Sequence, residues 1–307
     1  MSQPNLNNEE PSKRNNEEPS KRNNEEPSKR NNEEPGKRNN EEPDAKRRKT
    51  EDGQLQNESY EITYHNGDTY KGGMKDGLKN GEGKLTYHNG DTYKGGFKDD
   101  KRYGEGKHTK PNGSIFEGEW KDGQMNGKGK HTKPNGSIFE GEWKDGQMNG
   151  IGKLIFLNGS IFEGEWKDDK RHGKGKLILA NGSIFKGEWK DGQMNGIGKL
   201  IFPNGSILEG EWKDNKRNGI GKLICPSGAI YRGGCKDGQM NGIGKIIFPC
   251  GANYVGEFKD DKRHGNGKLI LPSGDIIEGE FKDDKEYNIK SYKLDYILVE
   301  GKKYKRC

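Results

Sequence analysis

Apolar and polar residues alternate along most of this chain in short segments that recur every 23 residues. In one copy, Phe162 and Trp166 share one face of an alternating segment, and Glu163 and Glu165 share the other. A second alternating segment, 173–179, follows a polar stretch, 167–172, that is expected to form a loop. Each copy therefore predicts two antiparallel strands, that is, one β-hairpin.

Ten such copies follow one another with no change of spacing. A unit this small cannot bury its apolar face alone, so the copies are expected to stack. The predicted fold is all-β: an elongated antiparallel meander of about twenty strands over residues 60–290. The first ring or aliphatic position of each copy is Tyr70, Tyr93, Phe116, Phe139, Phe162, Phe185, Leu208, Tyr231, Tyr254 and Ile277.

Side-chain chemistry predicts the register within each hairpin. Pairing Gly164 with Gly175 brings Phe162 opposite Leu177, so that a ring covers strand glycines and an apolar partner lies beside it. The opposite face then becomes a Glu–Lys ladder that also carries isoleucines. The same register pairs Trp166 with Gly173, Glu165 with Lys174, Glu163 with Lys176 and Ile161 with Ile178.

The junction between copies predicts a second type of turn. A two-residue turn at Asn158-Gly159 would place the ring row on the wrong face, whereas a three-residue loop with a left-handed glycine and a bulge restores the parity. This form is expected to pair Phe162 with Phe156, Trp166 with Gly152 and Glu165 with Lys153.

The recurring rings and glycines of the first strand are predicted to be structural. The eighth copy has Cys235 at a tryptophan position, which should weaken packing locally, and the tenth has Asn288 and Lys290 where the paired glycines should be. Residues 291–307 are expected to form a cap and tail, with 292–299 covering an edge strand. The structural positions are Tyr93, Gly95, Phe97, Phe116, Gly118, Trp120, Phe139, Gly141, Trp143, Phe162, Gly164, Trp166, Phe185, Gly187, Trp189, Gly210 and Trp212.

Residues 1–59 form a segment of different character. An eight-residue repeat, Asn-Asn-Glu-Glu-Pro-Ser-Lys-Arg, recurs with small variations through 7–47 and contains almost no apolar residue, which predicts a disordered tail. The tail is interpreted either as a solvated tether or as a spacer open to phosphorylation. Four basic residues, Lys46, Arg47, Arg48 and Lys49, resemble a nuclear-localisation cluster.

Composition narrows the class of function. Apolar residues make up 26% of the chain, which indicates a thin stacked sheet instead of a thick core. The first 59 residues carry 12 basic and 14 acidic side chains and the remainder 43 and 35, a net charge of +8 for the remainder. Spread over ten copies, this charge disfavours a nucleic-acid partner and permits an acidic protein or an anionic lipid surface.

No segment of the sequence predicts chemistry or membrane spanning. The four cysteines form no Cys-x-x-Cys pair, no metal-ligand spacing is present, and the Gly-x-Gly pairs precede no helix, so neither a metal nor a cofactor is expected. Carboxylate pairs recur in most copies, whereas an active site would be unique. No signal peptide or apolar run of about 20 residues is found, and we expect an intracellular, cytoplasmic protein, either free or at the membrane periphery.

The loops within the hairpins alternate between Gln-Met-Asn and Lys-Arg, with a period of 46 residues through much of the chain. The Lys-Arg pairs could form a basic comb for acidic lipid headgroups or an acidic filament, and the alternative is that preceding aspartates neutralise them. The candidate interaction residues are Lys101, Arg102, Lys170, Arg171, Lys216, Arg217, Lys262 and Arg263.

The segment from Phe139 to Gly152, Phe-Glu-Gly-Glu-Trp-Lys-Asp-Gly-Gln-Met-Asn-Gly-Ile-Gly, resembles the MORN repeat (membrane occupation and recognition nexus). The resemblance covers about three quarters of the chain. It implies an array of β-hairpins that serves as a lipid-associated or protein-binding platform. About seventeen residues follow the array, too few for the kinase or methyltransferase domains of other members, so the chain is similar to the repeat-only type.

Three functions therefore stay open. The first is a non-enzymatic scaffold whose exposed aromatic–glycine face or edge binds other proteins, or binds itself as an elongated homodimer. The second is a peripheral module that binds phosphoinositides or another anionic membrane lipid. The third is a regulatory subunit of an enzyme on another chain.

Overall fold

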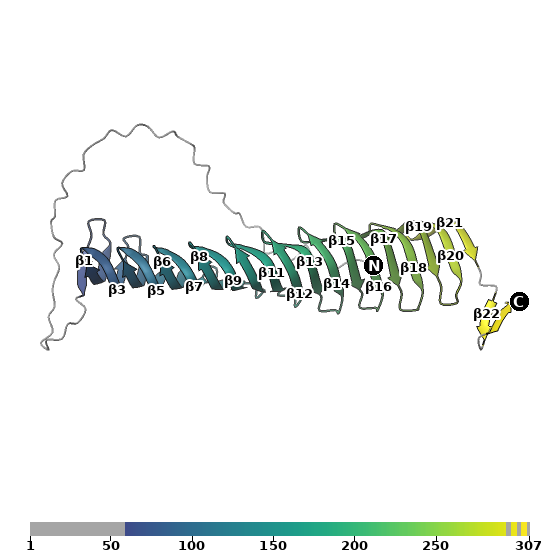
Figure 1. Ribbon diagram of the computed structural model, residues 1–307, viewed down its shortest axis with the longest axis horizontal. Coiled ribbons are helices and arrows are strands. Elements are labelled where there is room, and N and C mark those ends of the chain that lie inside the picture. The colour runs from purple at the N-terminus through teal and green to yellow at the C-terminus, as the bar shows by residue number, and fades with distance from the viewer. Residues whose placement is uncertain (1–58, 293–295, 300–301, 306–307) are drawn as a thin grey trace, which may run out of the picture. The chain divides into compact units, whose positions relative to one another are not determined.

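The computed structural model describes residues 59–292, 296–299 and 302–305. Its described residues form twenty-three strands and no helix. Strands β1 to β21 form one open antiparallel sheet of 21 strands, in which each strand pairs with its neighbours in the sequence (Figure 1). The predicted all-β stack of 23-residue hairpins is confirmed.

Each repeat contributes a seven-residue strand and then a nine-residue strand. The seven-residue strands are β2 (Thr69–Lys75), β4 (Thr92–Lys98), β6 (Ile115–Lys121), β8 (Ile138–Lys144), β10 (Ile161–Lys167), β12 (Ile184–Lys190), β14 (Ile207–Lys213), β16 (Ile230–Lys236), β18 (Asn253–Lys259) and β20 (Ile276–Lys282). The nine-residue strands are β3 (Leu78–Thr86), β5 (Lys101–Thr109), β7 (Gln124–Thr132), β9 (Gln147–Ile155), β11 (Lys170–Ile178), β13 (Gln193–Ile201), β15 (Lys216–Ile224), β17 (Gln239–Ile247) and β19 (Lys262–Ile270). The sheet begins with β1 (Tyr60–Thr63) and ends with β21 (Lys285–Tyr292).

The turn inside each hairpin is shorter than the sequence suggested. In place of the expected loop over 167–172, the structure has a two-residue turn made of Asp168 and Asp169. Both residues have positive φ angles, 48° and 63°. Such a turn matches the right-handed twist of the flanking strands, and aspartate tolerates the left-handed conformation better than most residues. The residues that follow, from Lys170 onward, therefore belong to a strand.

A β-bulge in the second strand changes the predicted pairing near this turn. The pairs Phe162–Leu177 and Gly164–Gly175 are as expected, but Trp166 lies opposite Arg171 instead of Gly173. Gly173, with φ of 58°, and Lys174 form the bulge, and glycine adopts that angle with the least strain.

The bulge also changes the role of the second glutamate in the strand. Glu165 does not form the expected cross-strand pair with the Lys174 side chain. Its Oε1 atom instead accepts a hydrogen bond of 2.9 Å from the backbone N–H of Lys174. The carboxylate therefore satisfies the backbone donor that the bulge releases.

The junction between repeats has the expected form at a shifted position. Phe156 N–H donates to Ser160 O, and Gly159, with φ of 83°, donates to Phe156 O, which closes a three-residue loop over 157–159. Phe162 therefore lies opposite Leu154 instead of Phe156. The predicted register between repeats was wrong by two residues, an even number, so every side chain keeps its predicted face. The same shift pairs Trp166 with Gly150 and Glu165 with Ile151, in place of the expected Gly152 and Lys153.

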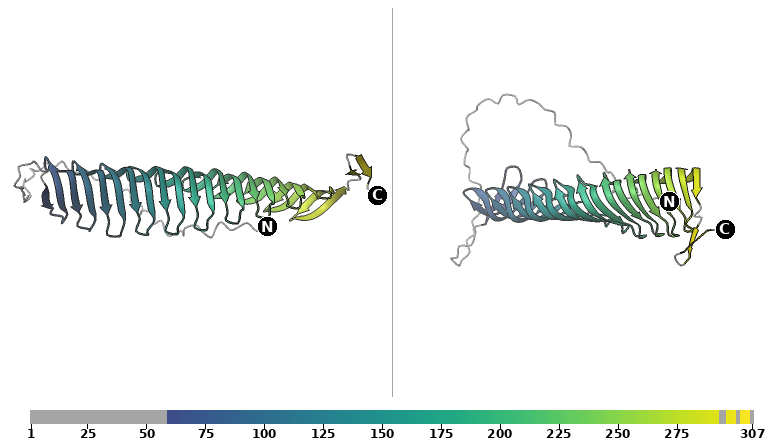
Figure 2. Two further views of the ribbon diagram at one scale, coloured as in Figure 1. Left: turned by 90° about the horizontal axis from the view of Figure 1, so that it is seen from below. Right: turned by 45° about the vertical axis from the view of Figure 1, so that its right-hand side comes forward.

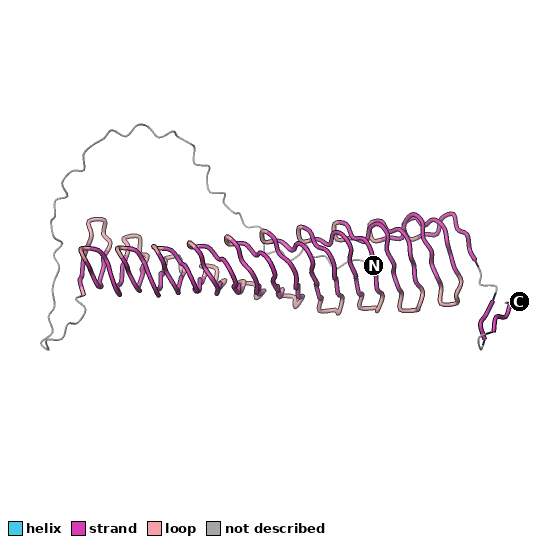
Figure 3. Tube along the Cα trace, viewed as in Figure 1, coloured by secondary structure: helices cyan, strands magenta, loops and turns pink. Residues whose placement is uncertain are grey.

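The two kinds of turn lie on opposite long edges of the sheet, and the strands change direction progressively along it (Figures 2 and 3). This is the twist expected of a long antiparallel sheet. The two-residue turns also connect neighbouring repeats. The Asp169 Oδ1 atom accepts a hydrogen bond of 2.8 Å from the Met148 N–H, and the Asp169 N–H donates a hydrogen bond to Met148 O.

The ring face of the sheet is its core. Phe162 is fully buried and Trp166 is 5% exposed. The Phe162 ring meets the edges of Trp166 and of Trp189 in the next repeat, with centroid separations of 5.2 and 5.1 Å. Edge-to-face contacts of this kind are favourable for aromatic pairs. The ring rows are thus buried, and the expectation that they stay exposed for partners was wrong.

The fully buried residues of this core divide into two clusters between the seventh and eighth repeats, and the half-buried Leu223 packs against both. One cluster of buried residues ends at Trp212, and a second begins at Tyr231 and contains Cys235. Leu208 and Cys235 stand where other repeats have rings, so the ladder of aromatic contacts has a gap there. The predicted local weakness at Cys235 corresponds to this gap.

The last hairpin departs from the others. Asn288 keeps the left-handed conformation of the glycine it replaces, with φ of 54°. The bulge is one residue shorter, so Ile289 and not Lys290 lies opposite Gly279. A separate two-stranded sheet follows, β22 (Tyr296–Val299) with β23 (Lys302–Lys305). The cap over 292–299 stays a prediction, and the octapeptide tail with its basic cluster at 46–49 lies outside the described residues.

Candidate interaction surface

The arginines of the predicted basic comb lie on the ring face. The two-residue turn and the bulge that follows place Arg171 opposite Trp166, within the strand. Its guanidinium carbon lies 4.3 Å from the centre of the Trp189 ring, and Nη2 donates to Gly192 O at 2.6 Å. Burial lowers the pKa of Arg171 to about 10, so the group stays charged at neutral pH. It stabilises the contact between repeats through a cation–π interaction.

The other three comb arginines occupy the same position. Arg102 lies 4.3 Å from the Trp120 ring centre and donates to Gly123 O. Arg217 is 2% exposed and, since Cys235 replaces the tryptophan, its Nη1 lies 3.5 Å from the Cys235 sulfur. The Arg263 Nε atom donates to Asp284 Oδ1 at 3.2 Å. These groups connect repeats and are not free to form an exposed comb.

The lysines of the comb are exposed, but they lie among aspartates. Lys170 is opposite Lys167, with the Asp168-Asp169 turn between them, so each such hairpin end carries two cations and two anions. Lys101 and Asp122 of the next turn lie 3.7 Å apart, both well exposed. This edge is close to neutral, as the alternative interpretation of the comb expected. Of the remaining lysines, Lys262 has the same surroundings, whereas the turn beside Lys216 is Asp214-Asn215 and carries one anion fewer.

A concentration of positive charge lies instead on the face opposite the rings. We name as the basic row the side chains that lie opposite one another across all 21 strands of the sheet, starting at Glu61 and ending at Lys290. Fourteen members are cationic: Lys71, Lys84, Lys94, Lys107, Lys130, Lys153, Lys176, Lys186, Lys199, Lys222, Arg232, Lys245, Lys268 and Lys290. Six are acidic: Glu61, Glu117, Glu140, Glu163, Glu209 and Glu278.

Apolar side chains lie on both sides of the basic row. On the side of the junction loops, an isoleucine row runs without interruption across β8 to β17, made of Ile138, Ile155, Ile161, Ile178, Ile184, Ile201, Ile207, Ile224, Ile230 and Ile247. On the other side lie four outer isoleucines, Ile151, Ile197, Ile220 and Ile243, which are 59%, 59%, 67% and 68% exposed.

Sequence reasoning predicted the alternation of this face but not its charge. Within a hairpin, the lysine after Gly-x-Gly lies opposite the third residue of the first strand, as predicted, and the corrected junction register joins these pairs from repeat to repeat into one row. The signal was present as a lysine that recurs in every Gly-x-Gly-Lys, opposed by a residue that varies between Glu, Lys, Arg and Val.

A shallow recess opens beside the outer isoleucines. It has a volume of about 400 Å³ and is lined in part by Ile151, Glu165, Lys167 and His172. Similar recesses recur at equivalent places, one beside Lys128 and Glu142 and one beside Glu257 and Lys259. A row of shallow recesses is suited to extended contacts with a partner, because none of them is deep enough to enclose a small molecule.

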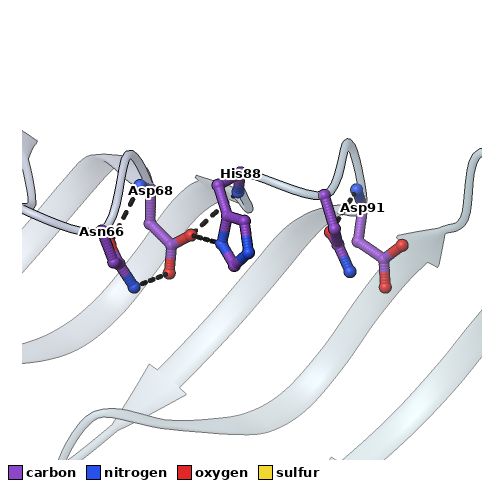
Figure 4. A network of polar contacts seen from close by, with 5 residues as sticks. Asn66, Asp68, His88 and Asp91 are labelled. Carbon is purple, nitrogen blue, oxygen red and sulfur yellow. Dashed lines mark hydrogen bonds and ion pairs between the residues drawn. The ribbon is translucent and has the colours of Figure 1, made fainter.

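The junction loops connect to one another along the opposite edge. In the first two repeats, Asp68 accepts hydrogen bonds from the backbone N–H and from Nδ1 of His88, at 2.9 and 3.1 Å, and from Asn66 Nδ2 at 3.0 Å (Figure 4). The backbone N–H of His88 holds the pKa of Asp68 below its ordinary value. Later repeats use serine, as where Leu157 N–H donates to Ser137 Oγ. These contacts stabilise the stacking of repeats.

Within the described part of the chain, no group of three or more His, Cys, Asp or Glu side chains could hold a metal ion. In the same residues there is no helix long and apolar enough to cross a membrane.

Two solved structures illustrate what the fold is similar to. The TCP10 domain of Danio rerio CPAP, in complex with a peptide of Danio rerio STIL, is 13% identical, with a TM-score of 0.38 over 81% of this chain and 99% of that one. The SAS-4 (dCPAP) TCP domain of Drosophila melanogaster, in complex with a proline-rich motif of Ana2 (dSTIL), is 17% identical, with a TM-score of 0.33 over 58% of this chain and 90% of that one. No curated protein sequence matches the chain.

The family comparison matches most of the sheet. Nine consecutive segments between residues 70 and 276 match the MORN repeat, each beginning at or next to the first ring or aliphatic position of a copy. The tenth copy, which starts at Ile277, lies beyond the matched residues yet forms the hairpin β20–β21. The chain belongs to the MORN-repeat family.

Proposed function

We propose that this chain is a non-enzymatic scaffold that binds other proteins along the face opposite the buried rings. The observation that carries the proposal is the exposure of Ile197, Ile220 and Ile243, at 59% to 68%. Exposed apolar side chains gathered on one face of a sheet are typical of interaction surfaces. The sheet does not need these side chains for its core, which is supplied by the rings.

Burial of the ring face supports the choice of the opposite face. A partner that used the rings would have to open contacts such as those of Phe162 with Trp166 and Trp189. Those contacts connect successive repeats, so opening them would weaken the array itself. A partner can contact the apolar and charged side chains of the opposite face without opening these ring contacts.

A second candidate function is peripheral binding to an anionic lipid surface, phosphoinositides included. The fourteen cations of the basic row favour it, because clustered lysines are attracted to acidic headgroups. Self-association as a homodimer and a role as a regulatory subunit of an enzyme on another chain would use the same surface. An intracellular location at the membrane periphery, or in the nucleus, stays a prediction.

The test removes the exposed apolar side chains and keeps the fold. We expect the full chain carrying Ile197→Thr, Ile220→Thr and Ile243→Thr to capture its partners from cell extract at least tenfold less than the unchanged chain. Threonine keeps the strand preference, so thermal stability should change little. Leu157→Ser is the matched control, since it removes an exposed apolar side chain from a junction loop.

Equal capture by the triple variant and the unchanged chain would contradict the proposed surface. Failure of the unchanged chain to capture any protein, together with sedimentation on phosphoinositide vesicles, would favour the lipid function instead.

A further inference from the structure

Between β10 and β18, the basic row contains two places where the sheet opposes cations with cations. Lys186 on β12 lies between Lys176 on β11 and Lys199 on β13. Four strands further on, Arg232 on β16 lies between Lys222 and Lys245. Like charges directly opposite one another destabilise a sheet. Neither Lys186 nor Arg232 makes an ion pair within the described residues.

Neighbouring repeats place a carboxylate at the same position. Glu163 lies between Lys153 and Lys176, and its Oε1 is 2.9 Å from the Lys153 Nζ. Glu209 is paired in the same way with Lys199, at 2.6 Å. Hydrogen bonds and charge from these lysines lower the pKa of both glutamates. A carboxylate is therefore the counterion that this position accommodates, and the repeats at Lys186 and Arg232 lack one of their own.

The two cationic places are also flanked by apolar side chains. Next to Lys186 and Arg232 on the same strands, Ile184 and Ile230 belong to the isoleucine row. On the other side, Ile197 and Ile220 belong to the outer isoleucines. The surface from β11 to β17, which we name the amphipathic strip, thus presents cations beside an unbroken isoleucine row on one side and, on the other, outer isoleucines that alternate with Glu188, Glu211 and Gly234. The other run of unopposed cations, in β2 to β5, is bordered by threonines and lacks this character.

We propose that the amphipathic strip binds an acidic segment of a partner protein, whose carboxylates lie at Lys186 and Arg232 and whose apolar side chains contact the bordering isoleucines. The two cationic centres are four strands apart, roughly 19 Å at about 4.8 Å per strand, so the segment carries two acidic groups at that separation. This inference rests on the proposed scaffold function and identifies the chemistry of the partner.

The shape of the sheet favours a polypeptide over a lipid surface. The strands change direction progressively along the sheet (Figure 2), so the basic row, which runs across the strands, follows a twisted path. A planar bilayer would meet the row over part of its length only, whereas a peptide segment can follow the twist. Alternating charge and apolar contact also suits a peptide, since its side chains supply both.

The decisive variant replaces the two unopposed cations by the residue that their neighbours use. In the full chain, Lys186→Glu with Arg232→Glu reproduces the arrangement of Glu163 and Glu209, and each new carboxylate gains two flanking lysines. The variant should therefore melt at the same temperature as the unchanged chain or higher. Loss of binding in this variant cannot be ascribed to misfolding.

The probe is a fluorescein-labelled peptide of twelve residues in which glutamate and leucine alternate. Fluorescence anisotropy should show salt-sensitive binding that weakens at least tenfold in the double variant. Lys190→Glu with Lys213→Glu is the matched control, since it makes the same change of charge at exposed positions near the two-residue turns and should alter affinity less than twofold. A peptide with glutamine in place of glutamate should bind at least tenfold more weakly.

Each other outcome overturns the inference in a distinguishable way. Equal weakening in both double variants would show attraction by net charge alone. Binding of phosphatidylserine vesicles with no binding of the peptide would assign the strip to lipid. If the unchanged chain captures partners from cell extract and the Lys186→Glu, Arg232→Glu chain captures the same partners equally, the scaffold function stands and this inference fails. If the unchanged chain captures none, the scaffold function itself fails.

Discussion

At the scale of single residues, the ring face tolerates polar substitutions only where a partner satisfies them. His108 and His131 stand where later repeats have Leu154 and Leu177. His131 lies flat on the Phe116 ring, with centroids 3.9 Å apart, and its Nε2 is 2.9 Å from Ser114 Oγ. The imidazole is thus packed as a neutral ring.

This packing predicts a loss of stability in acid. Burial lowers the pKa of His131 from 6.5 to about 4, so between these values the unfolded chain binds a proton that the folded chain does not. Stability therefore falls as the pH decreases through this window, and above it His131 contributes no pH dependence. We expect His131→Leu to have a smaller drop in urea midpoint between pH 6.5 and pH 4 than the unchanged chain. An equal drop in urea midpoint for His131→Leu and the unchanged chain would contradict this prediction.

At the scale of the hairpin, there are two kinds of end. An Asp-Gly turn is followed by Gln-Met or, in the first copy, Leu-Lys, and an Asp-Asp or Asp-Asn turn is followed by Lys-Arg or, in the last copy, Lys-Glu. Asp169 and Asn215 each accept a hydrogen bond from a methionine N–H of the preceding repeat, at 2.8 and 2.9 Å. The second turn residue thus combines a left-handed backbone with a contact to its neighbour.

Asp169 provides a test of this contact. Asp169→Asn should change the free energy of unfolding by less than about 0.5 kcal/mol, because Asn215 makes the same contact in another repeat. Asp169→Ala removes the acceptor and places alanine at φ of 63°, so a loss of about 2 kcal/mol is expected. Hydrogen exchange at the Met148 amide should speed up in the alanine variant only. Equal exchange in both variants would show that the hydrogen bond contributes nothing.

The hairpin is also where sequence prediction reached its limit. Alternation identified both strands, their faces and the glycine pair Gly164–Gly175, since these depend on a period of two. The bulge at Gly173 could not be predicted, because a left-handed glycine and an ordinary strand glycine look the same in the sequence. That bulge decides that Arg171 lies on Trp189 and not at the surface. The excess of cations in the basic row was missed for another reason, because the predicted junction register was wrong by two residues.

At the scale of the whole sheet, the repeats are coupled through the ladder of rings, and the ladder has one gap. Buried residues divide into a cluster that ends at Trp212 and another that starts at Tyr231. In a linear array, stability depends on contacts between neighbours, so the gap is the place where the two parts can unfold separately.

Restoring the missing ring should couple the two parts. We expect Cys235→Trp to give Arg217 the aromatic partner that Arg171 has in Trp189, to raise the melting temperature, and to bring two unfolding steps closer to one in calorimetry. Cys250→Ala, at an exposed junction position, is the control and should leave the profile unchanged. An unaltered profile for Cys235→Trp would refute the gap as a weak point.

The alternation of Glu163, Lys186, Glu209 and Arg232 repeats every second hairpin, which constrains how such an array can change in length over evolution. Gain or loss of a pair of copies keeps glutamate and cation alternating from repeat to repeat, whereas gain of one copy places two residues of the same charge in succession. Residues 108–127 and 131–150 are identical, as a single gain of one copy would leave them, and there Glu117, Glu140 and Glu163 follow one another with no cation at this position. Between β10 and β16, by contrast, only the gain or loss of 46 residues keeps the order of glutamate and cation.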